Sequence, residues 1–461
     1  ESEFQSVQEG IVAMVPVADA TVTAVSDGAW SEPATWSAGV PGAESRVYIP
    51  DGRRVTYDTV SDTPIAWIRV DGTLTFSTQV TTRLTVDTLV VTDIGHLAVG
   101  SRAAPVPFGA SAEIVFANVV GQPEVDENLG LGLLAFGRVD VNGAPKSPFH
   151  RTTSLPAVGA TEFTLIETPI EWAVGDRLLV PATMPARHGG VDELVTITAI
   201  DGANVTFTPA LAEQRVSPRA DLTPHVANLT RSVVFRSANT AQPERGHIQL
   251  LHRREFDVRY ASLTDLARSD KINRLEGDNL PNRYPLYVLH NGPGSSFEDP
   301  SRIVGNVVER SIGQAFVVND SHVALDFNVA YDVVGGGFVI EGGNETGAMR
   351  YNLAVHATGR DTENHPKSAA GNFEIAAGGV GFWSNSRLIY NFGNVAANTK
   401  GYGFVYFHRG TAVSNDRVRR KSLDHPDAVH GLDYGLGNGT NQDKAAIQGF
   451  HDNEAYGTEL A

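Results

Sequence analysis

The sequence predicts an all-β protein in which an N-terminal β-rich domain precedes a right-handed parallel β-helix. First, 46 glycines and 24 prolines punctuate short runs of Val, Ile, Thr and Phe along the 461 residues. Second, no long segment has the apolar period of about 3.6 residues that indicates a helix. Third, a short aromatic motif recurs in the C-terminal half at multiples of about 22 residues, a repeat length typical of one coil of a solenoid built from short strands.

The repeated motif is a small residue followed by an aromatic and an apolar one. Its copies begin at Ala315, Gly337, Gly381 and Gly403, so the middle interval is twice as long as the first and the last. Equivalent residues of stacked coils lie about 4.8 Å apart. We therefore expect an interior ladder made of Phe316, Phe338, Phe382 and Phe404.

A second repeat consists of asparagines that begin short apolar triplets. Asn306, Asn328 and Asn394 each lie nine residues before a copy of the aromatic motif, and related triplets begin at Asn352 and Asn453. A stacked asparagine can form hydrogen bonds with the backbone of the next coil. We expect this structural role for these residues.

The chain is predicted to divide into four parts: an N-terminal lead over 1–23, a β-rich domain over 24–120, a connecting β region over 121–245, and the β-helix over 246–461. Residues 1–20 are expected to be an edge strand or a loose lead. Tight Gly and Pro turns in 24–120 suit a β-sandwich or β-roll that helps to cap the helix, with its tryptophans in the core. In the connecting region, Trp172–Val180 is the clearest strand.

Two segments interrupt the period of the repeat, 359–380 and about 409–447, and we expect them to form one wall of a groove. Residues 453–457 resemble the start of another coil, although the sequence stops at Ala461. An uncovered last coil would expose strand edges. We therefore expect either a further stretch of polypeptide or a partner chain to cover this coil.

Charge and composition exclude several classes of function. The formal net charge is -17, which argues against nucleic acid or an anionic membrane as a partner. The chain has no cysteine, which excludes disulfides, thiolate zinc sites and a cysteine nucleophile. No apolar run approaches the roughly 18 residues of a membrane span, so we expect this chain not to cross a bilayer.

Several of these segments resemble one known family, the cell-migration-inducing and transmembrane hyaluronidases. Residues 27–57 and 84–100 are similar to the eight-glycine domain of that family. Collinear matches follow at residues 172–176, 246–248, 283–286, 337–341, 381–385 and 403–408. The resemblance implies a secreted or cell-surface protein with an eight-glycine domain and a parallel β-helix. It also implies a uronate-containing polysaccharide such as hyaluronan as the substrate class.

The chain departs from the family at three histidines. The family sequence Tyr-Pro-Ile-His-Phe-His corresponds here to Tyr-Pro-Leu-Tyr-Val-Leu, so Tyr287 and Leu289 replace two histidines. Where the family has Val-His-Gly, this chain has Val-Asn-Asp, with Asn319 in place of the third histidine. The family acid pair is reduced to Glu341, which is followed by Gly342.

Aligning the coils on the aromatic motif places polar residues at the ends of four strands, in two neighbouring columns. One column holds Leu289, Asn319, Glu341, Asn385 and Phe407, and the next holds His290, Asp320, Gly342, Ser386 and His408. Polysaccharide-active solenoids need a carboxylate and a second acid or base beside the sugar, together with aromatic platforms. Alternatively, such polar residues bond the backbone at the corners of the coils.

These columns define the candidate site. The candidate catalytic residues are Glu341, His408, Asp320 and His290. The candidate substrate-binding residues are Trp383 and Tyr406 for stacking, Asn319 and Asn385 for hydrogen bonds, and Arg283 or Arg409 for a uronate carboxylate. The basic run 417–421 is a further candidate for the carboxylate. No cofactor is indicated with certainty. Calcium is an option, for which residues 424–427 offer one His between two Asp.

Two functions remain open at this point. The first is a hyaluronidase-like hydrolase or lyase that acts on an extracellular polysaccharide. The second is a non-catalytic carbohydrate-binding, adhesive or structural surface protein that has kept the fold and lost the histidines.

Overall fold

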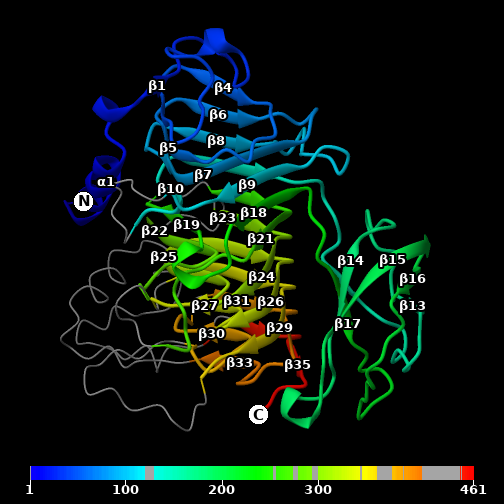
Figure 1. Ribbon diagram of the computed structural model, residues 1–461. Helices are drawn as coiled ribbons and strands as arrows, with labels where there is room; N and C mark the ends of the chain where they lie inside the picture. The colour runs from blue at the N-terminus through cyan, green and yellow to red at the C-terminus, as the bar shows by residue number, and fades with distance from the viewer. Residues whose placement is uncertain are drawn as a thin grey trace, which may run out of the picture.

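The computed structural model describes residues 2–119, 129–252, 256–273, 279–292, 300–342, 345–360, 376–387, 389–406, 447 and 449–460. Its main body is a column of stacked parallel strands that runs from the N-terminal to the C-terminal part of the chain (Figure 1). A smaller antiparallel sheet lies beside the column (Figure 1). The predicted fold class, an all-β parallel β-helix, is confirmed.

The strands of the column form three parallel ladders. The first ladder consists of β1 (Val22–Thr23), β3 (Arg46–Ile49), β5 (Ile65–Val70), β7 (Thr82–Val91), β10 (Gly132–Ala135), β19 (His247–Leu251), β22 (Leu286–Gly292), β25 (Phe316–Asp326), β27 (Phe338–Ile340), β30 (Phe382–Ser384) and β33 (Phe404–Tyr406). The second ladder consists of β2 (Gly28–Ala29), β4 (Arg54–Tyr57), β6 (Thr73–Phe76), β8 (His96–Val99), β11 (Arg138–Asn142), β20 (Asp257–Arg259), β23 (Ser301–Val304), the second half of β25, β28 (Thr346–Arg350), β31 (Ile389–Phe392) and β34 (Gly449–His451).

The third ladder begins with the first half of β7. It continues through β9 (Ala112–Phe116), β18 (Val233–Ser237), β21 (Ala261–Thr264), β24 (Val307–Ser311), β26 (Val329–Val334), β29 (Leu353–Thr358), β32 (Val395–Ala397) and β35 (Glu454–Tyr456). Each coil therefore contributes one strand to each ladder, and side chains alternate between the interior and the outside.

The predicted phenylalanine ladder is confirmed in the interior. Phe316, Phe338, Phe382 and Phe404 follow one another in register on the first ladder. Their rings are stacked, with successive centroids 4.9, 4.8 and 4.8 Å apart. They belong to one continuous apolar core that extends through the coils from Val22 to Ala396.

The predicted asparagine ladder is also confirmed, at the corner between the second and third ladders. The backbone N–H and the side-chain Nδ2 of Asn306 both donate to Oδ1 of Asn328, at 2.9 and 3.1 Å. Asn328 bonds Asn352 in the same way, and the pattern continues through Asn394 to Asn453. Each Nδ2 also donates to a carbonyl oxygen of the preceding coil, for example Asn328 to Ile303 at 2.8 Å.

The N-terminal β region differs from the expected sandwich or roll. Strands β1 to β11 stack in the same three ladders as the later strands, so parallel stacking begins at Val22 rather than near residue 246. Val47 pairs with Ile68, and Ile68 pairs with Leu89, so these coils are close in length to the later ones. The tryptophans of this region lie in the core as expected, since Trp30 and Trp36 are buried with ring centroids 4.8 Å apart.

The N-terminal lead is a helix rather than an edge strand or a loose segment. Helix α1 (Ser2–Met14) places Ile11 and Met14 against outward-facing residues of the first ladder, including Trp67 and Leu134. Short 3-10 turns also occur, at Val17–Asp19, Pro33–Thr35, Ala186–His188 and Gln242–Glu244. Among the residues that the structure describes, no helix has the length and apolar character needed to traverse a membrane.

The connecting region contains an antiparallel sheet, here called the insertion, between β11 and β18. Its strand order is β12 (Phe149–Arg151), β17 (His225–Asn228), β14 (Arg177–Val180), β15 (Glu193–Asp201), β16 (Asn204–Thr208) and β13 (Glu162–Thr164). It has its own core, which includes Trp172, Leu178 and Phe207. The strand expected over 172–180 is shorter than predicted: only Arg177–Val180, strand β14, is extended.

The insertion packs along the third ladder of the column (Figure 1). Leu179 and Leu229 of this region contact outward apolar residues of successive coils, such as Val329 and Leu353. Three ion pairs also join the two parts: Arg177 with Glu309 at 3.1 Å, His356 with Asp192 at 3.2 Å, and Arg151 with Glu454. The insertion therefore covers the outer face of the third ladder.

Candidate functional site

The predicted polar column lies on the outer face of the first ladder. The phenylalanine ladder points inward, so the next residue along each strand points outward. This outward column, in register, is Tyr287, Val317, Val339, Trp383 and Val405. Two residues further on, the same face carries Leu289, Asn319, Glu341 and Asn385, which we call the polar row.

Glu341 is the centre of the polar row. Its carboxylate accepts a hydrogen bond from the Tyr287 hydroxyl at 2.9 Å and one from Asn319 Nδ2 at 3.3 Å. The side-chain amide of Asn385 donates to the Glu341 backbone carbonyl at 2.6 Å, and the Trp383 indole donates to Asn385 at 3.0 Å. Glu341 is half-buried. Four neighbouring side chains therefore fix the position of one carboxylate that remains partly open to solvent.

Tyr287 contacts the carboxylate as a neutral donor. Burial, followed by the nearby negative charge of Glu341, raises the pKa of Tyr287 well above its ordinary value. The phenol thus keeps its proton at any ordinary pH. Its role towards Glu341 is to donate a hydrogen bond rather than to act as a base.

His290 and Asp320 form a second pair at the corner next to the polar row. His290 Nδ1 lies 2.9 Å from Asp320 Oδ2, and both side chains are more than two-thirds buried. Both residues have positive φ angles, 48° and 47°, which His and Asp tolerate better than most side chains. A third residue of this corner, His252, stacks against His290 with ring centroids 6.3 Å apart, and Gln8 of α1 lies 3.2 Å from His252 Nδ1.

Two of the expected substrate-binding residues are placed elsewhere. Tyr406 is in register with Ser384 and so points into the column, where Asn391 Nδ2 donates to its hydroxyl at 2.6 Å. Arg283 is only 7% exposed, and its guanidinium donates to the carbonyl of Pro281 at 3.0 Å. Burial therefore removes both from the outer face, and the expected stacking and carboxylate-binding roles do not suit these positions.

The structure brings six of the expected residues to one surface. These are Glu341, Asp320, His290, Trp383, Asn319 and Asn385. His408, Arg409, Phe407 and the segments 417–421 and 424–427 lie outside the described residues. Within the described part of the chain, no group of three or more His, Asp or Glu is arranged to hold a metal ion.

Three neighbours of the site were not assigned to it from the sequence. Tyr287 could have been found, because it lies two residues before Leu289 and so shares its face. His252 pairs with His290 through the register of Leu251 with Leu289, but the spacing of the two histidines in the sequence does not follow the period of the later coils. Glu345 also supports the corner by accepting the backbone N–H of Asp320 at 3.0 Å.

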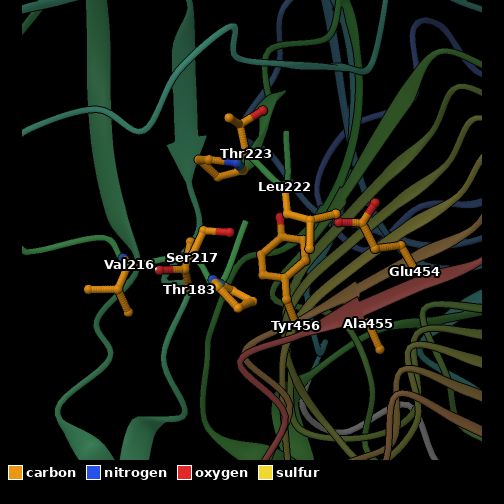
Figure 2. Close-up of a pocket in the computed structure, with 10 residues that line it drawn as sticks. Thr183, Val216, Ser217, Leu222, Thr223, Glu454, Ala455 and Tyr456 are labelled. Carbon is orange, nitrogen blue, oxygen red and sulfur yellow. Dashed lines mark hydrogen bonds between the residues drawn. The ribbon is translucent and has the colours of Figure 1, made fainter. Parts of the chain in front are cut away.

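A separate pocket of about 290 Å³ lies between the insertion and the last described coil (Figure 2). Its lining comprises Thr183, Val216, Ser217, Pro218, Leu222, Thr223 and Pro224 from the insertion, and Glu454, Ala455 and Tyr456 from β35. Glu454 is paired with Arg151, and the Tyr456 hydroxyl accepts the backbone N–H of His225 at 3.1 Å. The carboxylate of Glu454 and the hydroxyl of Tyr456 thus hold the insertion against the column. The polar row therefore remains the better candidate site.

Comparison with known proteins defines the class of this chain. Residues 35–155 match the model of the G8 domain, and residues 271–455 match the model of the CEMIP beta-helix. The chain therefore has the architecture of CEMIP-like proteins, a G8 domain followed by a parallel β-helix, and the resemblance to these hyaluronidases is confirmed at this level. The G8 match falls mainly on the first coils of the column.

Fibrocystin-L from human and from mouse are relatives among curated proteins. Each is 25% identical to this chain, in alignments of 382 and 384 residues respectively that cover 71% of the chain. The alignment spans only 9% of the length of either relative.

Similar solved structures include bacteriophage tailspikes. The tailspike of Acinetobacter baumannii bacteriophage AP22, in complex with a capsular saccharide, is 9% identical, with a TM-score of 0.18 over 78% of this chain and 59% of that one. The tailspike of Pseudomonas phage LKA1 is 10% identical, with a TM-score of 0.19 over 77% and 54%.

Proposed function

We propose that the protein is an extracellular or cell-surface, hyaluronidase-like hydrolase or lyase that acts on a uronate-containing polysaccharide. Glu341 would act as the acid or base, and the His290–Asp320 pair would supply the second proton-transfer group. Trp383 would provide an apolar platform for a sugar ring, and Asn319 and Asn385 would bond its hydroxyl groups.

The observation that carries this proposal is the set of contacts to the Glu341 carboxylate. Two of the three positions that hold histidine in the resembling family are Tyr287 and Asn319, and both donate to this one carboxylate. The side chains around Glu341 thus come from positions that hold histidine in the family, and here they are neutral hydrogen-bond donors instead of imidazoles. The G8 domain and the CEMIP beta-helix support the same assignment.

The chemistry requires the two acid–base groups to differ in protonation. A glycosidic leaving oxygen needs a proton, and the attacking water or the sugar C–H needs a base. Glu341 receives two hydrogen bonds from neutral donors, while His290 faces Asp320 at 2.9 Å. The carboxylate of Asp320 orients the imidazole, so this pair is placed to supply the second proton-transfer group.

The decisive experiment is incubation with a panel of glycosaminoglycans and bacterial polysaccharides, with and without calcium, followed by sizing of the products. The wild type is expected to shorten at least one uronate-containing polymer, and the isosteric Glu341→Gln variant is expected to lose that activity. Glu162→Gln, an exposed acid on strand β13 of the insertion, is the matched control and should leave activity unchanged. Equal activity of wild type and Glu341→Gln would refute the role of Glu341.

The alternative function is non-catalytic carbohydrate binding. It is favoured by the same substitutions, because Tyr287, Leu289 and Asn319 provide no group that exchanges a proton near neutral pH. In that case the panel would show intact polymers throughout, together with binding that weakens in Glu341→Gln.

A further inference from the structure

One corner of the column forces the backbone into the left-handed region in successive coils. The corner follows the strands of the second ladder, and its residues are Tyr260, Gly305, Phe327, Tyr351, Gly393 and Asp452. All six have φ between 52° and 68°. Glycine or aspartate suits this conformation, whereas a bulky aromatic residue there is strained. The sequence nevertheless places aromatic residues at three of the six positions.

Two aromatic residues of this corner, Phe327 and Tyr351, form one set with others on the neighbouring strands. Phe327 and Tyr351 stack at 5.1 Å with planes 13° apart, and Tyr351 meets Phe392 at 4.9 Å. Phe392 in turn contacts His451 at 4.5 Å, and Tyr390 lies 6.3 Å from the same imidazole. We call these five residues the aromatic stripe.

The stripe remains open to solvent although its members are large. Phe327, Tyr351 and Tyr390 are 44%, 39% and 42% exposed. Glycines make room for two of the rings, because a Cβ at Gly393 would come within 2.7 Å of the Tyr351 ring, and one at Gly449 within 2.6 Å of the Tyr390 ring. The two stacked centroids are further apart than ring thickness requires, so the rings are offset and each leaves part of a face uncovered.

We propose that the aromatic stripe binds a linear polysaccharide, one sugar ring against each exposed aromatic ring, at a place distinct from the polar row. This inference rests on the proposed function for the class of ligand. Phe327 and Tyr351 lie at the opposite end of the second ladder from Glu341, and Tyr390, Phe392 and His451 lie on the strands β31 and β34 of that ladder. Within one coil, strand β28 from Thr346 to Arg350 separates Glu341 from Tyr351 of the stripe. The aromatic stripe would hold the polymer while the polar row acts on another part of the same polymer.

The shape and chemistry of the stripe favour this occupant over a protein. A stable protein interface buries about 800 Å² on each partner, whereas the stripe is only one or two side chains wide and suits a single extended chain. An extended peptide would need free main-chain partners. At this corner, however, the N–H groups of Phe327, Tyr351 and Gly393 already donate to the next coil, at 2.9, 2.9 and 3.2 Å.

Charge supports the same choice. Arg350, beside the stripe, is held by Asp326 through two hydrogen bonds of 2.8 and 2.6 Å, so this pair adds no net charge next to the rings, and the exposed carboxylate of Asp452 lies 3.0 Å from His451 Nδ1. In a chain of net charge -17, the Arg350–Asp326 pair thus adds nothing to the repulsion of an acidic polymer. Sugar C–H groups can then pack on the rings while hydroxyl groups remain in water.

The test uses Phe327→Gly and Tyr351→Gly, singly and together, in the full chain. Glycine already occupies this corner at Gly305 and Gly393 with the same sign of φ, so these variants should keep the thermal midpoint of the wild type. The control is Tyr402→Ala, which removes a tyrosine that is 41% exposed at another corner. Binding is measured by affinity electrophoresis through gels containing hyaluronan, chondroitin sulfate, heparan sulfate or uncharged hydroxyethyl cellulose.

The double variant is expected to raise the Kd for the retarding polymer about tenfold or more, with Tyr402→Ala unchanged. Unchanged retardation of the double variant would overturn the inference, as would an equal loss in Tyr402→Ala. Retardation lost only in Glu341→Gln would overturn it while leaving the proposed function in place. A wild type that no polymer in the panel retards would overturn both.

Discussion

Replacing Asn328 by alanine tests how much the asparagine ladder contributes to the column. Asn328 Oδ1 accepts both the backbone N–H and one side-chain N–H of Asn306, and its Nδ2 donates to the Ile303 carbonyl and to Asn352. Asn306 and Asn328 are completely buried. The variant therefore leaves two buried N–H groups of Asn306 without a partner, and it removes one hydrogen bond to the carbonyl of Ile303, which also lies in the ladder between β23 and β25.

Each buried polar group that loses its partner costs about 1–3 kcal/mol, so the expected destabilisation from the two N–H groups is about 2–6 kcal/mol. That is a large fraction of the roughly 5–15 kcal/mol that holds a typical domain together. The urea midpoint of the column should fall sharply, with little change in m-value if unfolding stays cooperative. Hydrogen exchange should also accelerate at the amide of Asn306.

The matched control is Asn453→Ala at the end of the same ladder. Asn453 also accepts two hydrogen bonds, from Asn394, but it is half-buried, so water can replace its bonds. A loss of less than about 1 kcal/mol in Asn328→Ala, or an equal loss in the two variants, would refute the reasoning that burial makes these bonds indispensable.

Three further predictions concern the core and the docking of the insertion. Phe338→Ala should cost about 3–5 kcal/mol in urea unfolding, because Phe338 is stacked between two rings in the interior; a loss below about 1 kcal/mol would contradict the interior ladder. Burial lowers the pKa of His225 to about 3, whereas the pKa of histidine in the unfolded chain is about 6.5. The contribution of neutral His225 to the free energy of unfolding should therefore be complete above about pH 6.5, and it should fall by up to about 4 kcal/mol as the pH drops towards 3. Thermal midpoints across this range should show that loss in the wild type and much less of it in His225→Gln. The hydrogen bond to Asp192 raises the pKa of His356. This pair therefore stabilises the protein fully below about pH 6.5, and the stabilisation is lost as the pH rises through the pKa of His356 in the folded protein. His356→Gln should lower the thermal midpoint at pH 5.5 and leave it nearly unchanged at pH 8.5.

The later coils could be predicted from the sequence because their repeated residues have unmistakable identities. Phe338 and Phe382 share one column, and Asn328 and Asn352 share another, so the register can be counted directly from the motif. In the first coils, the equivalent positions are Val47, Ile68 and Leu89. Any aliphatic side chain fills such a core position almost equally well, so the period of these coils leaves no visible motif.

The antiparallel insertion could not be separated from the coils by pattern alone. Its strands have the same short apolar runs as those of the column, and β propensity describes how a residue fits a pleated surface rather than which partner it pairs with. Strand direction is decided by contacts distant in sequence, such as β14 with β17. Trp172 belongs to the core of this separate sheet.

The candidate site was partly predictable, because alternation along a strand is a strict rule. Glu341, Asn319 and Asn385 share a face once the phenylalanine column is known to point inward. The same rule assigns Tyr406 to the interior, since the neighbouring Val405 shares the outward column with Trp383. Alternation along a strand could not predict the hydrogen bond from Tyr287 to Glu341, because this bond spans two coils and depends on the length of the tyrosine side chain.

The geometry of the column suggests why function would lie at its corners. Interior positions must repeat from coil to coil, because a change at Phe338 disturbs the stacked ring on either side. The outer face of the third ladder is covered by the insertion. At the corners, the residue can differ from coil to coil: His290 and Asp320 follow one another at one corner, and Phe327 and Tyr351 follow one another at another despite the strain of a positive φ for aromatic residues. Variation at these positions changes the surface of the column while leaving its ladders intact, which makes the corners the places where a new ligand can be recognised at the least expense of stability.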